Sequence, residues 1–327
     1  MNQRRRIAQK LDELGRRRTP FFFLIDFDLR EHIIESLDRL PETISFSFPG
    51  LRHEHLSAIG KGTREPIRYR AVPPSYATYK KAFDRVYEAL QRGDSYLLNL
   101  TFPTLFECDA DLETLYTRSE APFKLLLQNR FVCFSPERFV RIEGNTISTY
   151  PMKGTIDATL PDAQRRLMEN PKEQAEHTMI VDLLRNDLGI VSEKVRVERF
   201  RYVERLHTAR GDLLQSSSEI RGELPSDWRE RLGEILTALL PAGSVTGTPK
   251  RKTVQIIRNV ESYRRGFYTG IFGIFDGENL DSAVAIRFIE RQNDGTLFYK
   301  SGGGITAESD PEAEYRELKE KIYVPFL

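Results

Sequence analysis

Apolar positions along the chain form two kinds of pattern, short uninterrupted runs and longer stretches with helical spacing. The run FFFLIDF at 21–27 predicts a buried strand, and SYLLNLTFPTLF at 95–106 predicts another. Between them, residues 79–91 repeat apolar side chains at helical spacing and stop near Gly93, which predicts a helix. Residues 52–75 show no periodicity and are interpreted as a connecting region.

The middle of the chain predicts a hairpin followed by a strong helix. Residues 131–151 contain short apolar runs broken by SPE and EGN, as in a hairpin. The next helix is expected over 171–188, with Asn170 as its cap, Pro171 in its first turn and Gly189 at its end. A further helix is expected from Pro249.

The last third predicts a meander of three strands and a final helix. The strands are FYTGIFGIF, LDSAVAIRFIER and TLFYKSGGGIT, separated by the turns DGEN and QNDG. Ser309 and Glu312 have the spacing of a capping box at the start of the helix. Strands and helices mix without a regular βαβ rhythm, which favours an α+β fold over a doubly wound sheet.

Charge and composition narrow the class of protein. The chain has 327 residues with 49 Lys+Arg and 48 Asp+Glu, and this near-neutral balance argues against a general nucleic-acid binder. Residues 1–18 are basic and place Ile7, Leu11 and Leu14 at helical spacing, as in a solvated amphipathic helix. No apolar segment is long enough to span a membrane or to act as a signal peptide. Cys108 and Cys133 have no metal-ligand spacing, so we expect a reduced, cytoplasmic protein.

Two predicted helices carry acidic residues three positions apart. Glu173 and Glu176 form one pair, and Glu314 and Glu317 form the other. Each pair shares one helical face. Acids near a helix N-terminus are common for electrostatic reasons alone. However, Glu176 leads into an apolar stripe, and four inward carboxylates would repel one another without a cation such as Mg²⁺.

Other residues with chemical potential lie in strands and glycine-rich segments. Arg287 is expected on a strand face with Ala283 and Ala285, where its fork has room for a planar anion, although an edge arginine reaching solvent is an equal alternative. SGGGIT at 301–306 and PAGSVTGTPK at 241–250 are interpreted as loops that offer backbone N–H groups to an anion, or as ordinary turns. The second lacks the Gly-Lys-Ser/Thr ending of a P-loop.

Two side chains beside turns could take part in catalysis. Lys153 in YPMKGT is a surface lysine by default, but a lysine near other cations or in a dry pocket becomes a nucleophile. Glu137 in SPERF is by default a solvated turn acid, and otherwise a general acid.

Eight segments in order resemble the chorismate-utilising enzymes, from about Tyr79 to the C-terminus. They are GDSYLLNLT, SPERF, PMKGT, PKEQAEHTMIVDLLRNDLG, PAGSVTGTPK, RRGFYTGIFG, AIRF and GGGITAESDPEAEY. The resemblance implies two large antiparallel sheets packed as a sandwich with flanking helices. It also implies a short N-terminal segment, 1–75, packed on a chorismate-binding catalytic domain, 76–327, which is expected to form one structural unit.

PMKGT is similar to the lysine motif of the aminodeoxychorismate synthases, the para-aminobenzoate branch of this family that leads to folate, whereas anthranilate synthases usually carry alanine at the position of Lys153. The resemblance implies that Lys153 attacks ring carbon C2 of chorismate and expels the C4 hydroxyl, with Glu137 as the general acid/base. Ammonia then gives 4-amino-4-deoxychorismate. It also implies that Mg²⁺ is bound by Glu176 and Glu317, with Glu173 and Glu314 close by.

The resemblance further implies a set of residues that bind the substrate, and a partner protein. These residues are Arg287, Tyr268, Gly303, Gly304, Ser244, Lys321 and His207. A separate glutaminase subunit would supply ammonia, because neither cysteine lies in a glutaminase nucleophile motif. The alternatives are an anthranilate-type lyase and a non-catalytic anion-binding protein.

Three departures from the family pattern stand out. Leu97 replaces a frequent glutamine, and isochorismate and salicylate synthases have a base lysine there, so those reactions are disfavoured. HTAR at 207–210 replaces a more usual His-x-x-Ser, which weakens the role assigned to His207. The N-terminal residues that bind tryptophan in relatives are not recognisable.

Overall fold

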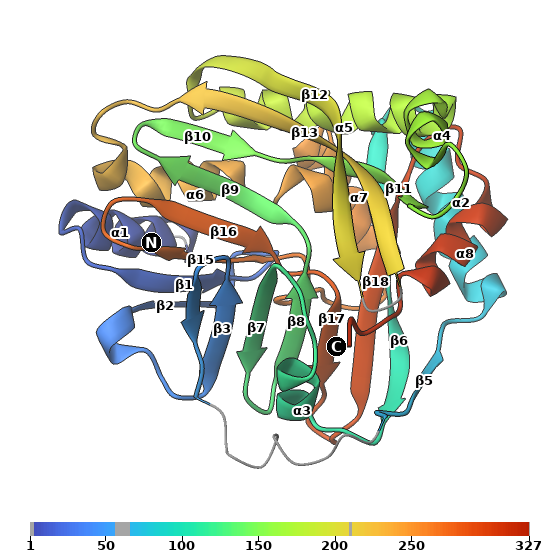
Figure 1. Ribbon diagram of the computed structural model, residues 1–327, viewed down its shortest axis with the longest axis horizontal. Coiled ribbons are helices and arrows are strands. Elements are labelled where there is room, and N and C mark those ends of the chain that lie inside the picture. The colour runs from blue at the N-terminus through green and yellow to red at the C-terminus, as the bar shows by residue number, and fades with distance from the viewer. Residues whose placement is uncertain (1–2, 56–65, 209–210, 327) are drawn as a thin grey trace. The chain divides into compact units, whose positions relative to one another are not determined.

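The fold consists of two compact units, each built around one nine-stranded antiparallel sheet (Figure 1). This computed structural model describes residues 3–55, 66–208 and 211–326. The first unit comprises residues 1–39, 137–244 and 271–284, and the second comprises 40–136, 245–270 and 285–327. The predicted α+β class, with two antiparallel sheets and flanking helices, is confirmed.

The expected boundary at residue 75 does not coincide with the edge of either unit. Each unit is assembled from three separate segments, because strands from earlier parts of the chain pair with strands from its last third. Phe21–Ile25 pairs with Ile271–Phe275 in the first unit, and Leu97–Cys108 pairs with Leu297–Ile305 in the second. Such long-range pairing leaves no local signal in the sequence.

The sheet of the first unit follows the order β11-β13-β10-β9-β16-β15-β1-β2, with β12 also paired to β13. Two of its helices, α4 and α5, pack on the β11–β13 region. The bounds of these elements are β1 Phe21–Ile25, β2 His32–Ser36, β9 Arg138–Glu143, β10 Thr146–Thr149, β11 Met152–Asp157, β12 Glu193–Thr208, β13 Gly211–Glu223, β15 Ile271–Phe275, β16 Leu280–Val284, α4 Ala163–Glu169 and α5 Pro171–Gly189.

The basic N-terminal segment forms α1 (Gln3–Arg16), as expected, but its apolar face is not solvated. Ile7 and Leu11 are fully buried where α1 packs against α6 (Leu232–Leu239). The Asp12 Oδ1 atom accepts hydrogen bonds from the backbone N–H groups of Gly233 (2.7 Å) and Glu234 (3.3 Å), so α1 caps a helix that has no side-chain cap of its own. The N-terminal helix therefore has a structural role in the first unit.

The sheet of the second unit follows the order β14-β6-β18-β17-β8-β7-β3-β4, with β5 also paired to β6. Helices α2, α7 and α8 pack against its β6, β14 and β18 strands, and α3 packs against β7 and β8. The bounds are β3 Ile44–Phe48, β4 Leu51–His53, β5 Tyr69–Val72, β6 Leu97–Cys108, β7 Phe123–Leu127, β8 Phe131–Ser135, β14 Gly247–Thr248, β17 Phe288–Arg291, β18 Leu297–Ile305, α2 Tyr76–Gln91, α3 Leu112–Thr117, α7 Lys250–Val260 and α8 Pro311–Glu320.

Two strand predictions were wrong in an informative way. The expected meander breaks within LDSAVAIRFIER, because β16 ends at Val284 in one sheet and β17 begins at Phe288 in the other. Arg287, between them, has a left-handed backbone (φ 54°) that no strand pattern predicts. In the same way, the predicted 131–151 hairpin is β9–β10 alone, since β8 pairs with β7 and β17.

The described helices include none that combines the length and the apolar character needed to cross a bilayer.

Candidate active site

Lys153 lies in a bulge of β11 in the first unit. The pairing of β11 with β13 shifts register between Met152 and Thr155, and Gly154 has a left-handed backbone (φ 78°). A Cβ atom at Gly154 would lie 3.0 Å from the Oε2 atom of Glu173 and 3.0 Å from Leu167. The glycine therefore allows the bulge and also makes room for the helix beside it.

The bulge presents Lys153 to α5, where it meets the first acidic pair. The Lys153 Nζ atom donates to the Oε2 atom of Glu176 at 3.0 Å, and the Lys172 ammonium lies 3.7 Å from Oε1 of the same carboxylate. The α5 helix begins as predicted, with Pro171 in its first turn and the Asn170 side chain accepting from the N–H groups of Lys172 and Glu173. The half-buried Glu173 and Glu176 thus sit on the first two turns of a well-capped helix.

His177 supports this region, although no local pattern in the sequence predicted its role. The side chain is fully buried, with Nε2 2.6 Å from the Ser218 hydroxyl oxygen. Burial, with Arg201 nearby as a second cause, lowers the pKa of His177 to about 4, so the ring is neutral at physiological pH. A neutral buried imidazole fixes the start of α5 against β13 without adding charge next to Glu176.

Glu137 and Ser244 are brought together within the first unit from positions 107 residues apart. The Ser244 hydroxyl donates to the Oε1 atom of Glu137 in a very short hydrogen bond. The backbone of Glu137 is held as well, because its carbonyl accepts from the N–H of Val284 at 3.1 Å. A carboxyl group oriented in this way can deliver a proton to a defined point.

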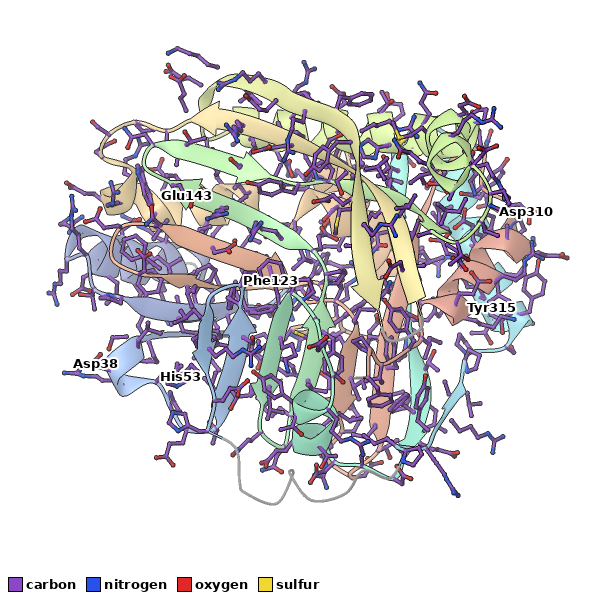
Figure 2. The ribbon with its side chains drawn as sticks, in the orientation of Figure 1. Asp38, His53, Phe123, Glu143, Asp310 and Tyr315 are labelled. Atoms are coloured by element: carbon purple, nitrogen blue, oxygen red, sulfur yellow. The ribbon has the colours of Figure 1, made fainter. Side chains whose placement is uncertain are left out.

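The second acidic pair lies on α8 in the second unit, and its helix begins differently from the prediction. Asp310, labelled in Figure 2, is the N-cap in place of Ser309. Its side chain accepts a hydrogen bond from the N–H of Ala313 at 2.8 Å. The expected capping box of Ser309 and Glu312 is therefore wrong. The Ser309 hydroxyl instead donates to the Oε1 atom of the buried Glu314 at 2.9 Å, so it fixes one member of the acidic pair.

The glycine segment next to this pair lies in the strand predicted for TLFYKSGGGIT and does not form a separate loop. Gly302, Gly303 and Gly304 belong to β18 and pair with β6. A Cβ atom at Gly303 would approach Glu314 Oε2 at 3.5 Å, Lys321 Nζ at 3.8 Å and Glu317 Oε1 at 3.9 Å. The bare backbone thus lies directly beside both acids and Lys321.

Lys321 connects α8 to the glycine segment of β18 in the second unit. Its Nζ atom lies 2.6 Å from the Oε1 atom of Glu317 and donates to the carbonyl of Gly302 at 3.0 Å. The lysine follows the last residue of α8, so the pair with Glu317 is a one-turn contact.

Arg287 and Tyr268, also in the second unit, are held close to buried aromatic side chains. Tyr268 is buried and packs against Phe288, with ring centres 5.9 Å apart, and burial raises its pKa well above the usual value. The Nε atom of Arg287 is buried without a hydrogen-bond partner. A buried guanidinium N–H without an acceptor indicates a place for an anionic ligand.

A buried ion pair supports the backbone around Tyr268. Arg265 and Glu261 have side chains only 2% exposed, and the closest contact between them is 2.7 Å. Arg265 also donates to the carbonyl oxygens of Val245 (2.7 Å) and Asn99 (2.6 Å). These bonds tie the PAGSVTGTPK segment, β6 and the Tyr268 turn together, and the segment itself forms a 3-10 turn and β14 and not a phosphate loop.

The structure describes only the backbone of His207, one of the predicted site residues. His207 is paired with Asp212 in the β12–β13 ribbon, but its side chain lies outside the described residues, as does all of Arg210.

The four glutamates lie as two separate pairs, one in each unit. Within the described ranges, no group of three or more His, Cys, Asp and Glu side chains is arranged as a metal site. Each unit nevertheless has two carboxylates close to a lysine, Lys153 in the first unit and Lys321 in the second. A glycine, Gly154 or Gly303, lies beside each pair and leaves the carboxylates accessible. Oxygen donors of this kind suit a hard divalent ion such as Mg²⁺.

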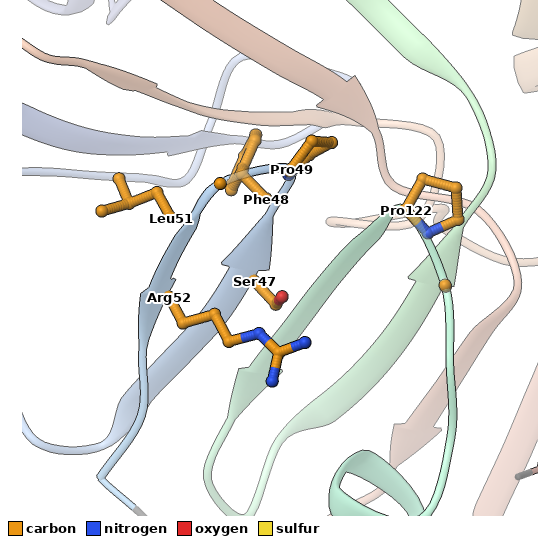
Figure 3. Close-up of a pocket in the computed structure, with 8 residues that line it drawn as sticks. Ser47, Phe48, Pro49, Leu51, Arg52 and Pro122 are labelled. Carbon is orange, nitrogen blue, oxygen red and sulfur yellow. The ribbon is translucent and has the colours of Figure 1, made fainter.

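A hollow elsewhere in the second unit does not contain any predicted site residue. It measures about 510 Å³ and lies at the β3–β4 turn, as Figure 3 shows. Its lining consists of Ser47, Phe48, Pro49, Gly50, Leu51, Arg52, Ala121 and Pro122. The side chains that line it offer one charge, on Arg52, and one hydroxyl, on Ser47, with no acid or base to activate that hydroxyl, so this hollow is not a candidate for the chemistry.

Comparison with known proteins assigns a family to the chain. The family described as chorismate binding enzyme matches residues 51–326. An uncharacterized PabA-like protein from Pasteurella multocida is 53% identical over 318 residues, which cover 97% of each chain. Aminodeoxychorismate synthase component 1 from Escherichia coli is 36% identical over 262 residues, which cover 75% of this chain and 56% of the synthase.

Solved structures show the same architecture. The menaquinone-specific isochorismate synthase from Escherichia coli has a TM-score of 0.70 at 18% identity, covering 97% of this chain and 80% of that one. At this identity the likeness shows the fold alone.

Proposed function

The chain belongs to the chorismate-binding enzymes, and from this premise we propose that it converts chorismate and ammonia into 4-amino-4-deoxychorismate and water. The observation that carries the proposal is Lys153, a lysine placed in a β-bulge with its amine 3.0 Å from a helix carboxylate. An anthranilate-type reaction has no use for this amine, since ammonia then adds to the ring directly.

Lys153 would act as a nucleophile in two balanced steps. The neutral amine forms a bond to ring carbon C2 while the bond from C4 to its hydroxyl breaks, and the hydroxyl leaves as water after receiving a proton. Ammonia then forms a bond to C4, the bond from C2 to the lysine nitrogen breaks, and Lys153 is regenerated. The net change is the replacement of one hydroxyl by one amino group.

Glu137 would supply the proton to the departing hydroxyl. Its hydrogen bond to Ser244 and its anchored backbone support this role, because proton transfer requires a carboxyl group held in one orientation. Carboxylate groups of the substrate would be bound by Arg287, Tyr268, Lys321 and the Gly303 and Gly304 backbone, with Ser244 and His207 as further binding residues.

We propose Mg²⁺ as the cofactor, with Glu176 and Glu317 as ligands and Glu173 and Glu314 close by. When bound, the ion would hold the ring carboxylate and favour loss of the C4 oxygen. The protein's part is to keep the carboxylates oriented, which the caps of α5 and α8 and the Ser309 hydroxyl do.

Ammonia would come from glutamine through a separate glutaminase subunit. Neither cysteine is suited to act as the glutaminase nucleophile, because burial raises the pKa of both thiols. Cys133 is also fully buried. Free ammonium should therefore replace the partner in vitro.

Product analysis tests the proposal. The protein is incubated with chorismate, Mg²⁺ and ammonium, and the products are separated by liquid chromatography with mass detection. We expect 4-amino-4-deoxychorismate as the main product. Anthranilate as the main product would overturn the branch assignment, and tight chorismate binding without turnover would favour a non-catalytic binding protein.

A further inference from the structure

Arg287 is surrounded by tyrosines, and one of them comes from the segment after the last helix. The Cζ atom of Arg287 lies 4.9 Å from the ring centre of Tyr323, and the Tyr323 hydroxyl also forms a side-chain hydrogen bond with Arg287. At this distance the face of the ring attracts the guanidinium. No family motif identified in the sequence includes Tyr323.

The backbone around Tyr323 is fixed on both sides. The hydroxyl of Tyr299 lies 3.0 Å from the carbonyl oxygens of both Lys321 and Tyr323. Tyr299 is fully buried, and so is nearly all of Val324, which belongs to the same apolar cluster. Beyond it, the N–H of Glu120 donates to the carbonyl of Pro325 at 2.8 Å. Tyr323 is therefore presented by an anchored segment and not by a loose chain end.

Lys321 and Tyr323 lie two residues apart in this segment, and their side chains contact different groups. Lys321 reaches the carbonyl of Gly302 and the Glu317 carboxylate, while Tyr323, two residues on, reaches Arg287. The Arg287 backbone is held independently, because its carbonyl accepts from the N–H of Phe134 at 3.1 Å. What the backbone does not fix is the orientation of the long Arg287 side chain.

We propose that Tyr323 is a positioning residue that holds the Arg287 guanidinium so that its N–H edge faces a substrate carboxylate. A ring against one face of a guanidinium leaves the donor edge available, which suits bidentate binding of a planar carboxylate. The Nε atom of Arg287, buried without a partner, is one donor of that edge. This inference rests on the proposed function, since the carboxylate that Arg287 would bind is the enolpyruvyl carboxylate of chorismate.

Substitution at Tyr323 should therefore change substrate binding and not the chemical step. Tyr323→Leu removes the ring, and we expect KM for chorismate to rise about tenfold with kcat within about twofold of wild type. Tyr323→Phe keeps the ring but loses the hydroxyl that hydrogen-bonds Arg287, so its KM should lie between those of wild type and Tyr323→Leu. A role in stability alone would not produce this split between KM and kcat.

A matched control is available on α8. Tyr315 also has a cation over its ring, with Lys319 Nζ 4.6 Å from the ring centre, and its hydroxyl donates to the carbonyl of Pro74. Tyr315→Phe keeps the ring and loses only this hydrogen bond, and it should leave KM unchanged. If Tyr323→Leu does not fold, as judged by thermal melting, Tyr323→Met is measured in its place.

Direct binding separates failure of this inference from failure of the proposed function. Chorismate binding is measured by calorimetry with Mg²⁺ and without ammonium, beside benzoate as a ring carboxylate without the enolpyruvyl group. We expect Tyr323→Leu to weaken chorismate binding about tenfold and to leave benzoate binding unchanged. Equal chorismate binding by wild type and variant would overturn this inference alone. No binding of chorismate by wild type would overturn the proposed function and this inference with it.

Discussion

The α5 helix of the first unit and the α8 helix of the second begin in the same way but use their lysines differently. Each has an Asn or Asp cap, a proline at the first helical position and two glutamates three residues apart. Each pair also meets an ammonium group, from Lys153 at 3.0 Å and from Lys321 at 2.6 Å. The two lysine side chains are similarly exposed, 31% and 28%, so burial does not separate them.

The difference lies in the backbone that carries each lysine. Lys321 pairs with a glutamate one turn earlier and is also bonded to the Gly302 carbonyl, so helix geometry alone creates the contact. Lys153 comes from a bulged strand 23 residues before Glu176, beside a glycine in a left-handed conformation. A bulge is a deviation from regular pairing that often re-aims a side chain near an active site. This difference supports the proposal that Lys153 is the nucleophile and that Lys321 binds a substrate carboxylate beside Glu317.

Exchange of each lysine for alanine gives the largest expected effect. Lys153→Ala should lower kcat for aminodeoxychorismate formation by about 10³-fold or more, since it removes the nucleophile. Lys321→Ala should mainly raise KM, by about 10–100-fold, because it removes a charged hydrogen-bond donor. Steady-state kinetics with ammonium measures both. Lys172→Ala, which removes a more exposed partner of Glu176, is the control and should retain most activity.

Loss of either acidic pair should abolish stabilisation by Mg²⁺. Bound Mg²⁺ at 100 times its dissociation constant should add about 2.7 kcal/mol to the free energy of unfolding of the wild-type protein. Glu176→Gln and Glu317→Gln should each remove most of this gain in thermal melting. Asp182→Asn and Glu312→Gln change exposed acids on the same two helices and should keep it. A gain retained by both pair variants would contradict the metal assignment.

Alanine substitutions at Gly154 and Gly144 distinguish the effect of backbone strain from the effect of crowding at the first acidic pair. Both have a left-handed backbone, and alanine at either position should cost about 1–2 kcal/mol in the free energy of unfolding. Only Gly154→Ala adds an atom 3.0 Å from the Glu173 carboxylate, whereas nothing lies within 4 Å of the atom added at Gly144. Denaturant unfolding should show similar losses, and only Gly154→Ala should also lose activity. Equal activity in the two variants would show that the position of Glu173 is unimportant.

The helix caps give the smallest effect. Asn170→Ala and Asp310→Ala should each lower the free energy of unfolding by about 1 kcal/mol, because each leaves backbone N–H groups without an acceptor. Urea titration measures this loss. Ser309→Ala is the informative neighbour, since the residue was expected to be a cap. It should affect stability less than Asp310→Ala does.

Local signals predicted α1, α2, α5, α7 and α8 and the acidic pairs on two of them, but not the short helices α3, α4 and α6. The cap and proline of α5 were predicted correctly. Of the apolar stripe expected after Glu176, Ile180 and Leu183 are buried and Leu184 is half-buried. The strand predictions that failed depend on pairing between strands that lie far apart in the sequence. Alternation within LDSAVAIRFIER predicted one strand, but the left-handed Arg287 ends that regularity and the two halves join different sheets. A positive φ in a residue other than glycine is rare, so no local pattern predicts it.

Side-chain contacts between residues far apart in the sequence could not be predicted from local patterns either. Nothing in HTMIVDLL distinguishes His177 as a buried neutral ring bonded to Ser218, 41 residues away. The same holds for Tyr323, which acquires its place beside Arg287 through hydrogen bonds from Tyr299 to the backbone. Motif resemblance found the residues thought to touch the substrate, and the structure added those that hold them.

The central claim, that Lys153 forms a bond to the substrate, can be tested by intact-protein mass spectrometry. The protein is mixed with chorismate and Mg²⁺ without ammonium, quenched in acid and digested to locate any added mass. The account predicts an adduct equal to chorismate minus water on the peptide that carries Lys153, absent from Lys153→Ala and lost when ammonium is added. Undiminished product formation by Lys153→Ala would contradict it.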